Sequence, residues 1–248
     1  MSGNDDKNII YIVGIGPGDI SMMTGEVVDT IKECDAIVGY PVYLRLIESL
    51  TEGKELISTP MKQEIERCRI AYEEAGKGKK VAVVSSGDAG IYGMASLMYE
   101  LLPEYPGTEL YVMAGITAAN SGAAVLGAPL SGDFAVISMS DLLTPFELIE
   151  RRLRAAAGAD MVIVLYNPSS HKRKDYLAKA CEIIQDIVPA DRACGYVKNI
   201  GREGQEAVAL SFGELRVTEV DMFTTVYIGN SMSYIEGGKM ITRRGYRK

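Results

Sequence analysis

Short runs of apolar residues, many of them β-branched, alternate with longer stretches in which apolar residues recur at helical spacing. In the first part of the chain the runs have the length of strands and the stretches have the length of helices. Continuous apolar strands separated by helices are typical of a parallel sheet with both faces covered, so we expect an α/β domain with a mainly parallel sheet. The predicted strands are 9–13, 36–38, 81–84 and 109–113, and the predicted helices are 26–33, 61–75 and 91–102.

The rhythm changes after Gly115. Three of the later strand candidates follow one another without long helices between them, which predicts a mixed α+β sheet. We therefore expect two α/β domains, 1–114 and 115–248. The later strands are predicted at 134–138, 161–165, 193–197, 207–211 and 224–228, and the helices at 117–126, 145–157 and 172–187.

Composition restricts the class of protein. Apolar residues make up 47% of the 248 residues and charged residues 24%, as in soluble globular proteins. No apolar run is long enough to span a membrane, and the polar first residues contain no signal-peptide core, so we expect a cytoplasmic protein. The net charge of −7 argues against nucleic acid as a partner.

The metal-binding residue types are sparse. The four cysteines form no C-x-x-C pair, and His171 is the single histidine. We therefore expect no metal site and reduced, mostly buried thiols. The last ten residues concentrate five positive charges, from Lys239 to Lys248, and no acid. This tail is either a solvated, frayed end or a contact for an anionic ligand.

Glycine-rich or polar loops follow four of the predicted strands, where α/β sheets bind ligands. The first, Gly14-Ile-Gly-Pro-Gly-Asp19, invites a dinucleotide interpretation, but Asp19 replaces the required small residue and Pro17 lacks an amide donor. The other three loops are residues 85–93, 115–121 and 166–170. Each has a structural explanation, because Asp88 and Thr117 are good helix caps and Asn167 begins a turn signal.

Taken together, the loops resemble the tetrapyrrole (precorrin) methylase family over residues 10–229. The resemblance rests on G-x-G-P-G-D, G-D-A-G-I-Y-G and G-I-T-A-A. The extended G-D-A-G-I-Y-G-M-A loop and Y-N-P-S-S are similar to the branch that methylates carbon 17 of precorrin-3, although Ala89 stands where sister enzymes often have proline.

The resemblance implies a two-domain tetrapyrrole methylase fold with S-adenosylmethionine in the cleft between the domains, and a homodimer. Carried over by position, it also implies which residues bind the cofactor. Asn167 stands where sister enzymes often have Met, so its contact is expected through the backbone. The residues that the resemblance implies as cofactor contacts are Pro17, Gly87, Asp88, Ile91, Thr117, Ala118 and Asn167.

The implied reaction is methylation of carbon 17 of cobalt-precorrin-3 or precorrin-3B, with ring contraction to precorrin-4 or its cobalt form, in cobalamin biosynthesis. Methyl transfer itself requires orientation rather than a metal or strong base. Ring contraction moves protons, for which we select Asp19, Ser86 and Tyr92, while Asn120, Lys198 and His171 remain alternatives. Arg45, Lys198, Arg202, Arg243 and Arg244 are candidate clamps for the substrate's carboxylates.

Three other functions remain open at this point. The nearest is a sister methylase that acts at another ring carbon. A nucleotide-binding oxidoreductase would use the first loop, and a non-catalytic tetrapyrrole carrier would bind pigment independently of S-adenosylmethionine.

Overall fold

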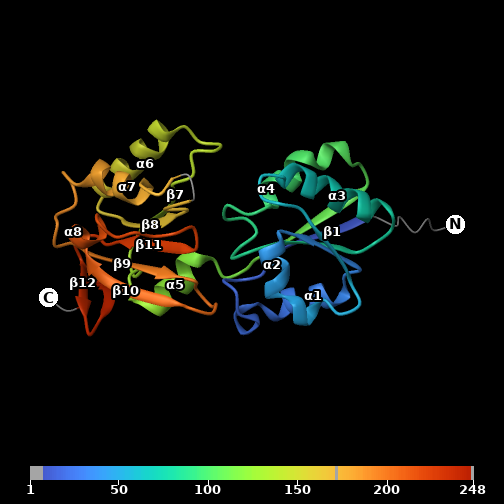
Figure 1. Cartoon of the computed structure of the whole chain (residues 1–248), viewed down its shortest axis with the longest axis horizontal. Helices are drawn as coiled ribbons and strands as arrows, with labels where there is room; N and C mark the ends of the chain where they lie inside the picture. The colour runs from blue at the N-terminus through green and yellow to red at the C-terminus, as the bar shows by residue number, and fades with distance from the viewer. Residues whose placement is uncertain (1–7, 171–172, 247–248) are drawn as a thin grey trace. The chain divides into compact units, whose positions relative to one another are not determined.

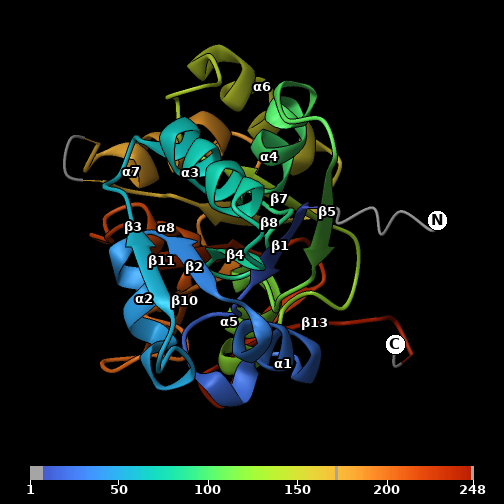
Figure 2. The same cartoon turned by 90° about the vertical axis from the view of Figure 1, so that its right-hand side faces the viewer.

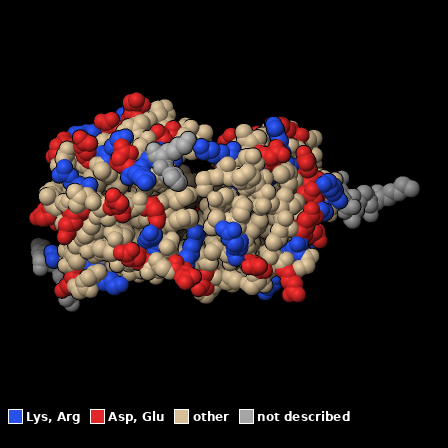
Figure 3. All heavy atoms as spheres, viewed as in Figure 1, with Lys and Arg blue, Asp and Glu red and all other residues tan. Residues whose placement is uncertain are grey.

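The computed structural model describes residues 8–170 and 173–246. It divides into two compact units, Met1–Thr117 and Ala118–Lys248. The sequence places the boundary after residue 114, and the structure places the division after Thr117. No helix in the described part of the chain is both long and apolar enough to cross a membrane. On the face shown in Figure 3, acidic and basic side chains are interspersed among the described residues.

A five-stranded sheet forms the centre of the first unit. Its strands are β1 Asn8–Gly14, β2 Ala36–Gly39, β3 Glu55–Ser58, β4 Val81–Ser85 and β5 Thr108–Met113. Its α-helices are α1 Gly25–Glu33, α2 Pro41–Leu46, α3 Glu64–Gly76 and α4 Ala95–Leu101. The strand order is β3-β2-β4-β1-β5, and every neighbouring pair is parallel, which confirms the predicted sheet. Helices α3 and α4 pack on one face, and α1 and α2 pack on the other (Figures 1 and 2).

The second unit contains a mixed sheet, as predicted. Its strands are β7 Phe134–Ser138, β8 Val162–Tyr166, β9 Ala193–Lys198, β10 Glu206–Ser211 and β11 Thr224–Ile228. Their order is β10-β9-β11-β8-β7, and only β7 and β8 are parallel neighbours. Its helices are α5 Ala118–Leu126, α6 Phe146–Gly158, α7 Tyr176–Ile184 and α8 Phe212–Leu215. Helices α6 and α7 cover one face of this sheet and α5 covers the other (Figure 1).

Three helices begin later than the sequence predicts. Helix α3 starts at Glu64 because Lys62 has a φ of 70°, and α4 starts at Ala95 because Tyr92 has a φ of 54°. Side chains in this left-handed region interrupt a right-handed helix. Helix α7 starts at Tyr176, after Ser170 and Arg173 pair with each other's backbone in a turn. The predicted helix residues 171 and 172 lie outside the described part.

Part of the basic tail is a strand, so the interpretation of a wholly frayed end is wrong. Strands β12 Ser233–Glu236 and β13 Lys239–Thr242 form a hairpin, and β13 also pairs in parallel with β6 Gly127–Ala128. Met240 is fully buried, and the Thr242 hydroxyl donates to the Pro129 carbonyl oxygen at 2.6 Å. Arg247 and Lys248 lie outside the described residues.

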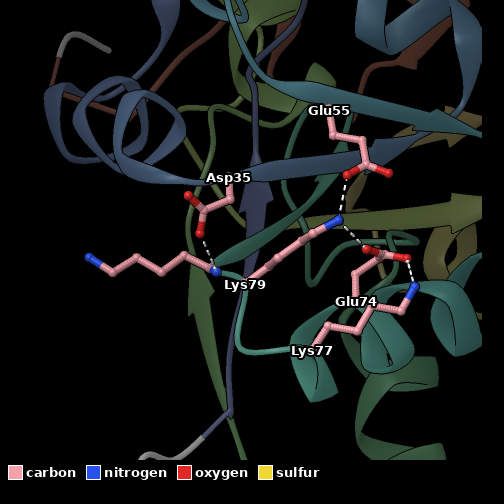
Figure 4. Close-up of polar contacts among 6 residues, drawn as sticks. Asp35, Glu55, Glu74, Lys77 and Lys79 are labelled. Atoms are coloured by element: carbon pink, nitrogen blue, oxygen red, sulfur yellow. Dashed lines mark hydrogen bonds and ion pairs between the residues drawn. The ribbon is translucent and has the colours of Figure 1, made fainter.

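A charged network joins elements at the amino-terminal edge of the first sheet. The Lys79 ammonium lies between the carboxylates of Glu55 and Glu74, and Lys77 contacts Glu74 at 2.6 Å (Figure 4). The Asp35 carboxylate accepts the backbone N–H of Lys80 at 2.8 Å. These contacts join β3, the end of α3 and the start of β4 on the side of the sheet opposite the glycine-rich loops.

We predict that Glu74→Gln lowers stability at neutral pH. Hydrogen bonds from Lys77 and Lys79 hold the pKa of Glu74 below its ordinary value of 4.5. A lowered pKa contributes stability above the unfolded-state value, and this contribution is lost as pH falls through the folded-state value. Urea midpoints should therefore differ between variant and wild type at pH 7 and converge as the pH falls below 4.5 and through the lowered pKa of Glu74. Glu73→Gln, at an exposed position on the same helix, is the control. A difference that persists in acid would contradict the charge-based explanation.

Candidate functional site

Three of the glycine-rich loops meet in the first unit at the carboxyl ends of β4, β1 and β5. These strands are adjacent and parallel, so the loops that follow them emerge at one edge of the sheet. Gly16 and Gly87 exchange two backbone hydrogen bonds, of 3.0 and 2.7 Å between nitrogen and oxygen. The Ile15 N–H donates to the Ser85 carbonyl oxygen at 2.9 Å. The first and second loops therefore form one backbone-paired structure.

The approach of these loops excludes side chains. A Cβ atom on Gly115 would lie 2.1 Å from the Gly87 carbonyl oxygen, and one on Gly14 would lie 2.7 Å from that same oxygen. Gly87 itself has a φ of 71°, in the left-handed region that favours glycine. The contact between the loops at this edge is consequently made by backbone amides and carbonyls, with no room for a side chain between them.

Asp88 ties the second loop to the third. Its Oδ1 accepts the N–H groups of Gly90 at 2.8 Å and Ile91 at 3.1 Å, and its Oδ2 accepts the Gly115 N–H at 2.9 Å. The interpretation of Asp88 as the cap of the following helix is wrong, because α4 begins only at Ala95 and Met94 occupies its N-cap position. A carboxylate is needed here because both of its oxygens act as acceptors.

The remaining predicted residues of the second loop differ in exposure. Ile91 and Tyr92 have 40% and 58% of their surface exposed, which is unusual for large apolar side chains in the middle of a tightly bonded loop. Ser86 is half-buried. The neighbouring Ser85 hydroxyl accepts the Met94 N–H at 3.2 Å and stabilises the end of the loop.

The first loop contains Pro17, which is buried, and Asp19, which is exposed. Asp19 is the N-cap of a short 3₁₀ helix, Ile20–Met22, and its Oδ1 accepts the Ser21 N–H at 2.8 Å. Its hydrogen bonds with Ser21 lower the pKa of the carboxyl group. Asp19 is therefore a helix cap in this structure.

In the second unit, two tyrosines fix the first turn of α5. The Tyr166 hydroxyl accepts the Ala119 N–H at 2.6 Å. The Tyr227 hydroxyl contacts the carbonyl oxygens of Ala118 and Ala119 at 2.8 and 3.0 Å. A Cβ on Gly122 would lie 2.3 Å from the same Tyr227 hydroxyl, which explains the small residue on this helix. Ala118 is thereby tied to β11, and Ala119 to both β8 and β11. Thr117 is buried at the end of the first unit.

Asn167 follows β8 with a φ of 53°, and its side-chain amide donates to the Ser138 hydroxyl at 3.0 Å.

Next to Asn167 lies a polar cluster that the sequence analysis missed. Arg173 contacts Asp141 at 2.7 Å, and the Tyr176 hydroxyl donates to the other Asp141 oxygen at 2.6 Å. These bonds lower the pKa of Asp141, with Tyr176 the larger cause, and raise that of Tyr176. Asp141 lies just beyond a predicted strand, so the strand-end rule applied there would have found it.

Several residues considered as substrate clamps have other partners. Lys198 pairs with Asp221 at 2.7 Å, and the Arg202 guanidinium lies 5.8 Å from the Phe223 ring centroid. Arg243 lies over Tyr234, and Arg244 over Tyr246. Strand β13 pairs with Gly127, the residue that follows α5. Because α5 has nine residues, β13 lies about 13 Å from Ala118 along the helix axis. Asn120 is exposed on α5, Arg45 lies in the last turn of α2, and His171 is outside the described residues.

No group of three or more His, Cys, Asp or Glu side chains suited to a metal ion occurs among the described residues. All four cysteines are buried and free of disulfides. Burial raises the pKa of Cys34 to about 11 and of Cys68, Cys181 and Cys194 to about 12, so they are unreactive thiols. A hollow of about 600 Å³ is lined by residues 62–66, and none of the predicted site residues lines it.

The family is established by its sequence profile. The profile of the Tetrapyrrole (Corrin/Porphyrin) Methylases matches residues 9–216. The chain belongs to this family of methyltransferases. Its fold is that of the two-domain tetrapyrrole methyltransferases, since it matches the crystal structure of the methyltransferase CobJ with a TM-score of 0.88 and 36% identity, over 94% of this chain and 99% of that one.

Curated relatives cover nearly the full chain. It is 43% identical to the probable cobalt-factor III C(17)-methyltransferase of Salmonella typhimurium, over 96% of this chain and 99% of that protein. It is 36% identical to the precorrin-3B C(17)-methyltransferase of a Sinorhizobium species, over 89% and 88%. It is 42% identical to the cobalt-factor III methyltransferase of Priestia megaterium over 98% of this chain, and it spans 46% of the length of that relative.

We predict that Asp88→Asn releases the bond between the second and third loops. An amide presents one acceptor oxygen, so either Gly115 or the Gly90–Ile91 pair loses its acceptor. Each N–H left unpaired should lower the unfolding free energy by about 1–3 kcal/mol. Hydrogen exchange should accelerate either at Gly115 or at Gly90 and Ile91, relative to Asp29→Asn, a substitution at an exposed position of α1. Unchanged exchange at Gly90, Ile91 and Gly115 would show that the bonds to Asp88 are not what orders these loops.

Proposed function

We propose that the protein transfers a methyl group from S-adenosylmethionine to carbon 17 of cobalt-factor III in cobalamin biosynthesis, with contraction of the ring. The observation that carries this proposal is the near full-length identity of 43% to a relative named for that reaction. The relative named for precorrin-3B, at 36%, is less similar, which favours the cobalt-containing substrate over the metal-free one. The runner-up is methyl transfer to another ring carbon.

The glycine-rich loops suit S-adenosylmethionine. Adenine, ribose and the methionine zwitterion can be held by backbone donors and acceptors. Gly90 is exposed and Gly115 is half-buried, and neither has a side chain that would keep a ligand from the backbone. We propose as contacts Pro17, Gly87, Asp88, Ile91, Thr117, Ala118 and Asn167. The fold also resembles a uroporphyrin-III C-methyltransferase of Thermus thermophilus complexed with S-adenosyl homocysteine, at 18% identity and a TM-score of 0.72.

The bound cofactor supplies a methyl group on a sulfonium. When bound, it would let the ring carbon take the methyl group by direct displacement, with the electron pair of the broken S–CH₃ bond remaining on sulfur. The protein's contribution is to hold the two reactants in line, and such orientation can lower a barrier by about 7–11 kcal/mol. The backbone pairing of Gly16 with Gly87 and the three bonds to Asp88 give the first unit's loops the rigidity that this positioning requires.

Ring contraction additionally moves protons, and we propose Asp19, Ser86 and Tyr92 for this role. Tyr92 is the most exposed of the large side chains in the second loop, and Asp19 is exposed on the first. We also propose a homodimer and a cytoplasmic location, which suits four buried free thiols.

The direct test incubates the purified chain with cobalt-factor III and methyl-deuterated S-adenosylmethionine. We expect a product that has gained one labelled methyl at carbon 17, located by NMR, with the absorbance change of ring contraction. Labelling at a different ring carbon would establish the runner-up instead. Tetrapyrrole binding without transfer and without any influence of S-adenosylmethionine would identify a carrier.

We predict that Gly87→Val abolishes cofactor binding. Valine is strained at a φ of 71°, and its branched side chain would stand where the cofactor meets the backbone. Calorimetry should show the Kd for S-adenosylhomocysteine raised at least about 100-fold, which corresponds to about 2.7 kcal/mol. Gly78→Val, at a φ of 82° before β4, is the matched control for backbone strain. Equal affinities in folded Gly87 and Gly78 variants would remove this loop from the cofactor site.

We predict that Asp19→Asn separates capping from proton transfer. Asparagine caps about as well as aspartate, so stability and S-adenosylhomocysteine affinity should be retained. Loss of an acid–base group should slow ring contraction by on the order of 10²-fold or more. Methylated and contracted products are scored separately by mass and absorbance. Wild-type turnover to the contracted product would leave Asp19 with its capping role alone.

A further inference from the structure

A cluster in the second unit gathers one arginine, one carboxylate and several hydroxyls at the ends of two strands. Strands β7 and β8 are parallel neighbours, so the loops after them lie at the same edge of the sheet. Arg173 belongs to the loop after β8, and Asp141 to the loop after β7. The cluster lies beside Asn167, whose amide is bonded to Ser138 at the end of β7.

The guanidinium of Arg173 is held on two of its three nitrogens. Its Nε donates to the Ser170 hydroxyl at 3.0 Å. One terminal nitrogen donates to Asp141 at 2.7 Å and to the Ser140 hydroxyl at 3.3 Å. The second terminal nitrogen has no partner among the described residues, although 81% of the side chain is buried, since its exposed fraction is 19%. A rigid guanidinium with one open edge is the arrangement that recognises a carboxylate.

The charges around this open edge leave an excess of positive charge. Asp141 neutralises Arg173, and its second oxygen is occupied by the Tyr176 hydroxyl. Asp175 pairs with Lys179 at 2.8 Å, while Lys174 is exposed beside them. With these two pairs balanced, Lys174 leaves one net positive charge just before the amino-terminal end of α7, where the helix dipole disfavours positive charge. A bound anion would offset this unfavourable placement.

We propose that Arg173 binds a peripheral carboxylate of the tetrapyrrole substrate and that Asp141 and Tyr176 orient its guanidinium for that contact. The assignment rests on the proposed function, because a tetrapyrrole acid is the ligand that brings several carboxylates to the strand-end edge. Arg173 is then a specificity residue for the substrate, distinct from the residues proposed for the cofactor. Asp141 is a positioning residue that acts through Arg173.

The test measures two affinities on each variant. Cobalt-factor III is titrated by absorbance and S-adenosylhomocysteine by calorimetry, on wild type, Arg173→Gln, Arg173→Lys and Asp141→Asn. Arg173→Gln should raise the tetrapyrrole Kd about 10- to 100-fold, while the Kd for S-adenosylhomocysteine changes less than about twofold. Lysine keeps the charge but loses the fork, so Arg173→Lys should recover part of the affinity. Asp141→Asn should raise the tetrapyrrole Kd by a smaller factor.

Arg154→Gln is the matched control, since Arg154 pairs with Asp186 at 2.8 Å on the exposed side of α6 and should leave both affinities unchanged. A second arm uses the same tetrapyrrole with its carboxylates esterified. Esterification should weaken binding to wild type and abolish most of the difference between wild type and Arg173→Gln. If Arg173→Gln does not fold, Arg173→Lys and the ester comparison on wild type decide the question.

An unchanged tetrapyrrole Kd in folded Arg173→Gln, or an equal loss of both affinities, would overturn the proposal. This result is distinguishable from failure of the proposed function. Wild type that binds the tetrapyrrole through Arg173 but does not methylate carbon 17 would refute the reaction and leave the carboxylate contact standing. If wild type methylates carbon 17 and Arg173→Gln does not change tetrapyrrole binding, the proposed reaction stands and the carboxylate contact is refuted.

Discussion

The close approach of three backbone segments, at Gly14, Gly87 and Gly115, is the constraint on which the first unit's loops depend. These segments follow three adjacent parallel strands, and no Cβ fits between them. Backbone polar groups brought this close must find partners. The Gly16–Gly87 pair and the two oxygens of Asp88 supply them, and they hold together the loops that carry the proposed cofactor contacts.

The second unit achieves rigidity by a different route. Its strand-end loops are joined through side chains, because β7 and β8 end in serines, Asn167 and the Asp141–Arg173 pair rather than in glycines. The tyrosine hydroxyls at positions 166 and 227 hold the first turn of α5 in the same manner. Side-chain bonds leave charged groups at the edge of the sheet in the second unit, whereas the first unit's loops are paired through their backbones.

The net charge of the chain does not show where its charged side chains lie in the fold. The chain has a net charge of −7, yet the network around Lys79 places its carboxylates at the amino-terminal edge of the first sheet. Arg67 is a buried cation that is held by backbone carbonyl oxygens rather than by carboxylates. Its guanidinium is only 4% exposed, donates to the carbonyl oxygens of Thr59 and Pro60, and has no carboxylate partner among the described residues. It fastens the loop after β3 beneath Met94, the residue that ends the glycine-rich loop.

Apolar periodicity predicted four strands of the parallel first sheet and the five strands of the mixed second sheet, because it reports which residues must be buried. It did not predict β3, which is mostly exposed, or α2, α8 and the β12–β13 hairpin. The sequence also located the four strand-end loops, since glycine and polar residues after an apolar run are local signals. It could not determine what Asp88 binds, because Gly115 is 27 positions away and is reached only through the sheet. Nor could it detect the Asp141–Arg173 pair, 32 positions apart, or the burial of β13 against β6. Those contacts depend on which strands become neighbours, and strand pairing is decided by the packing of the whole unit.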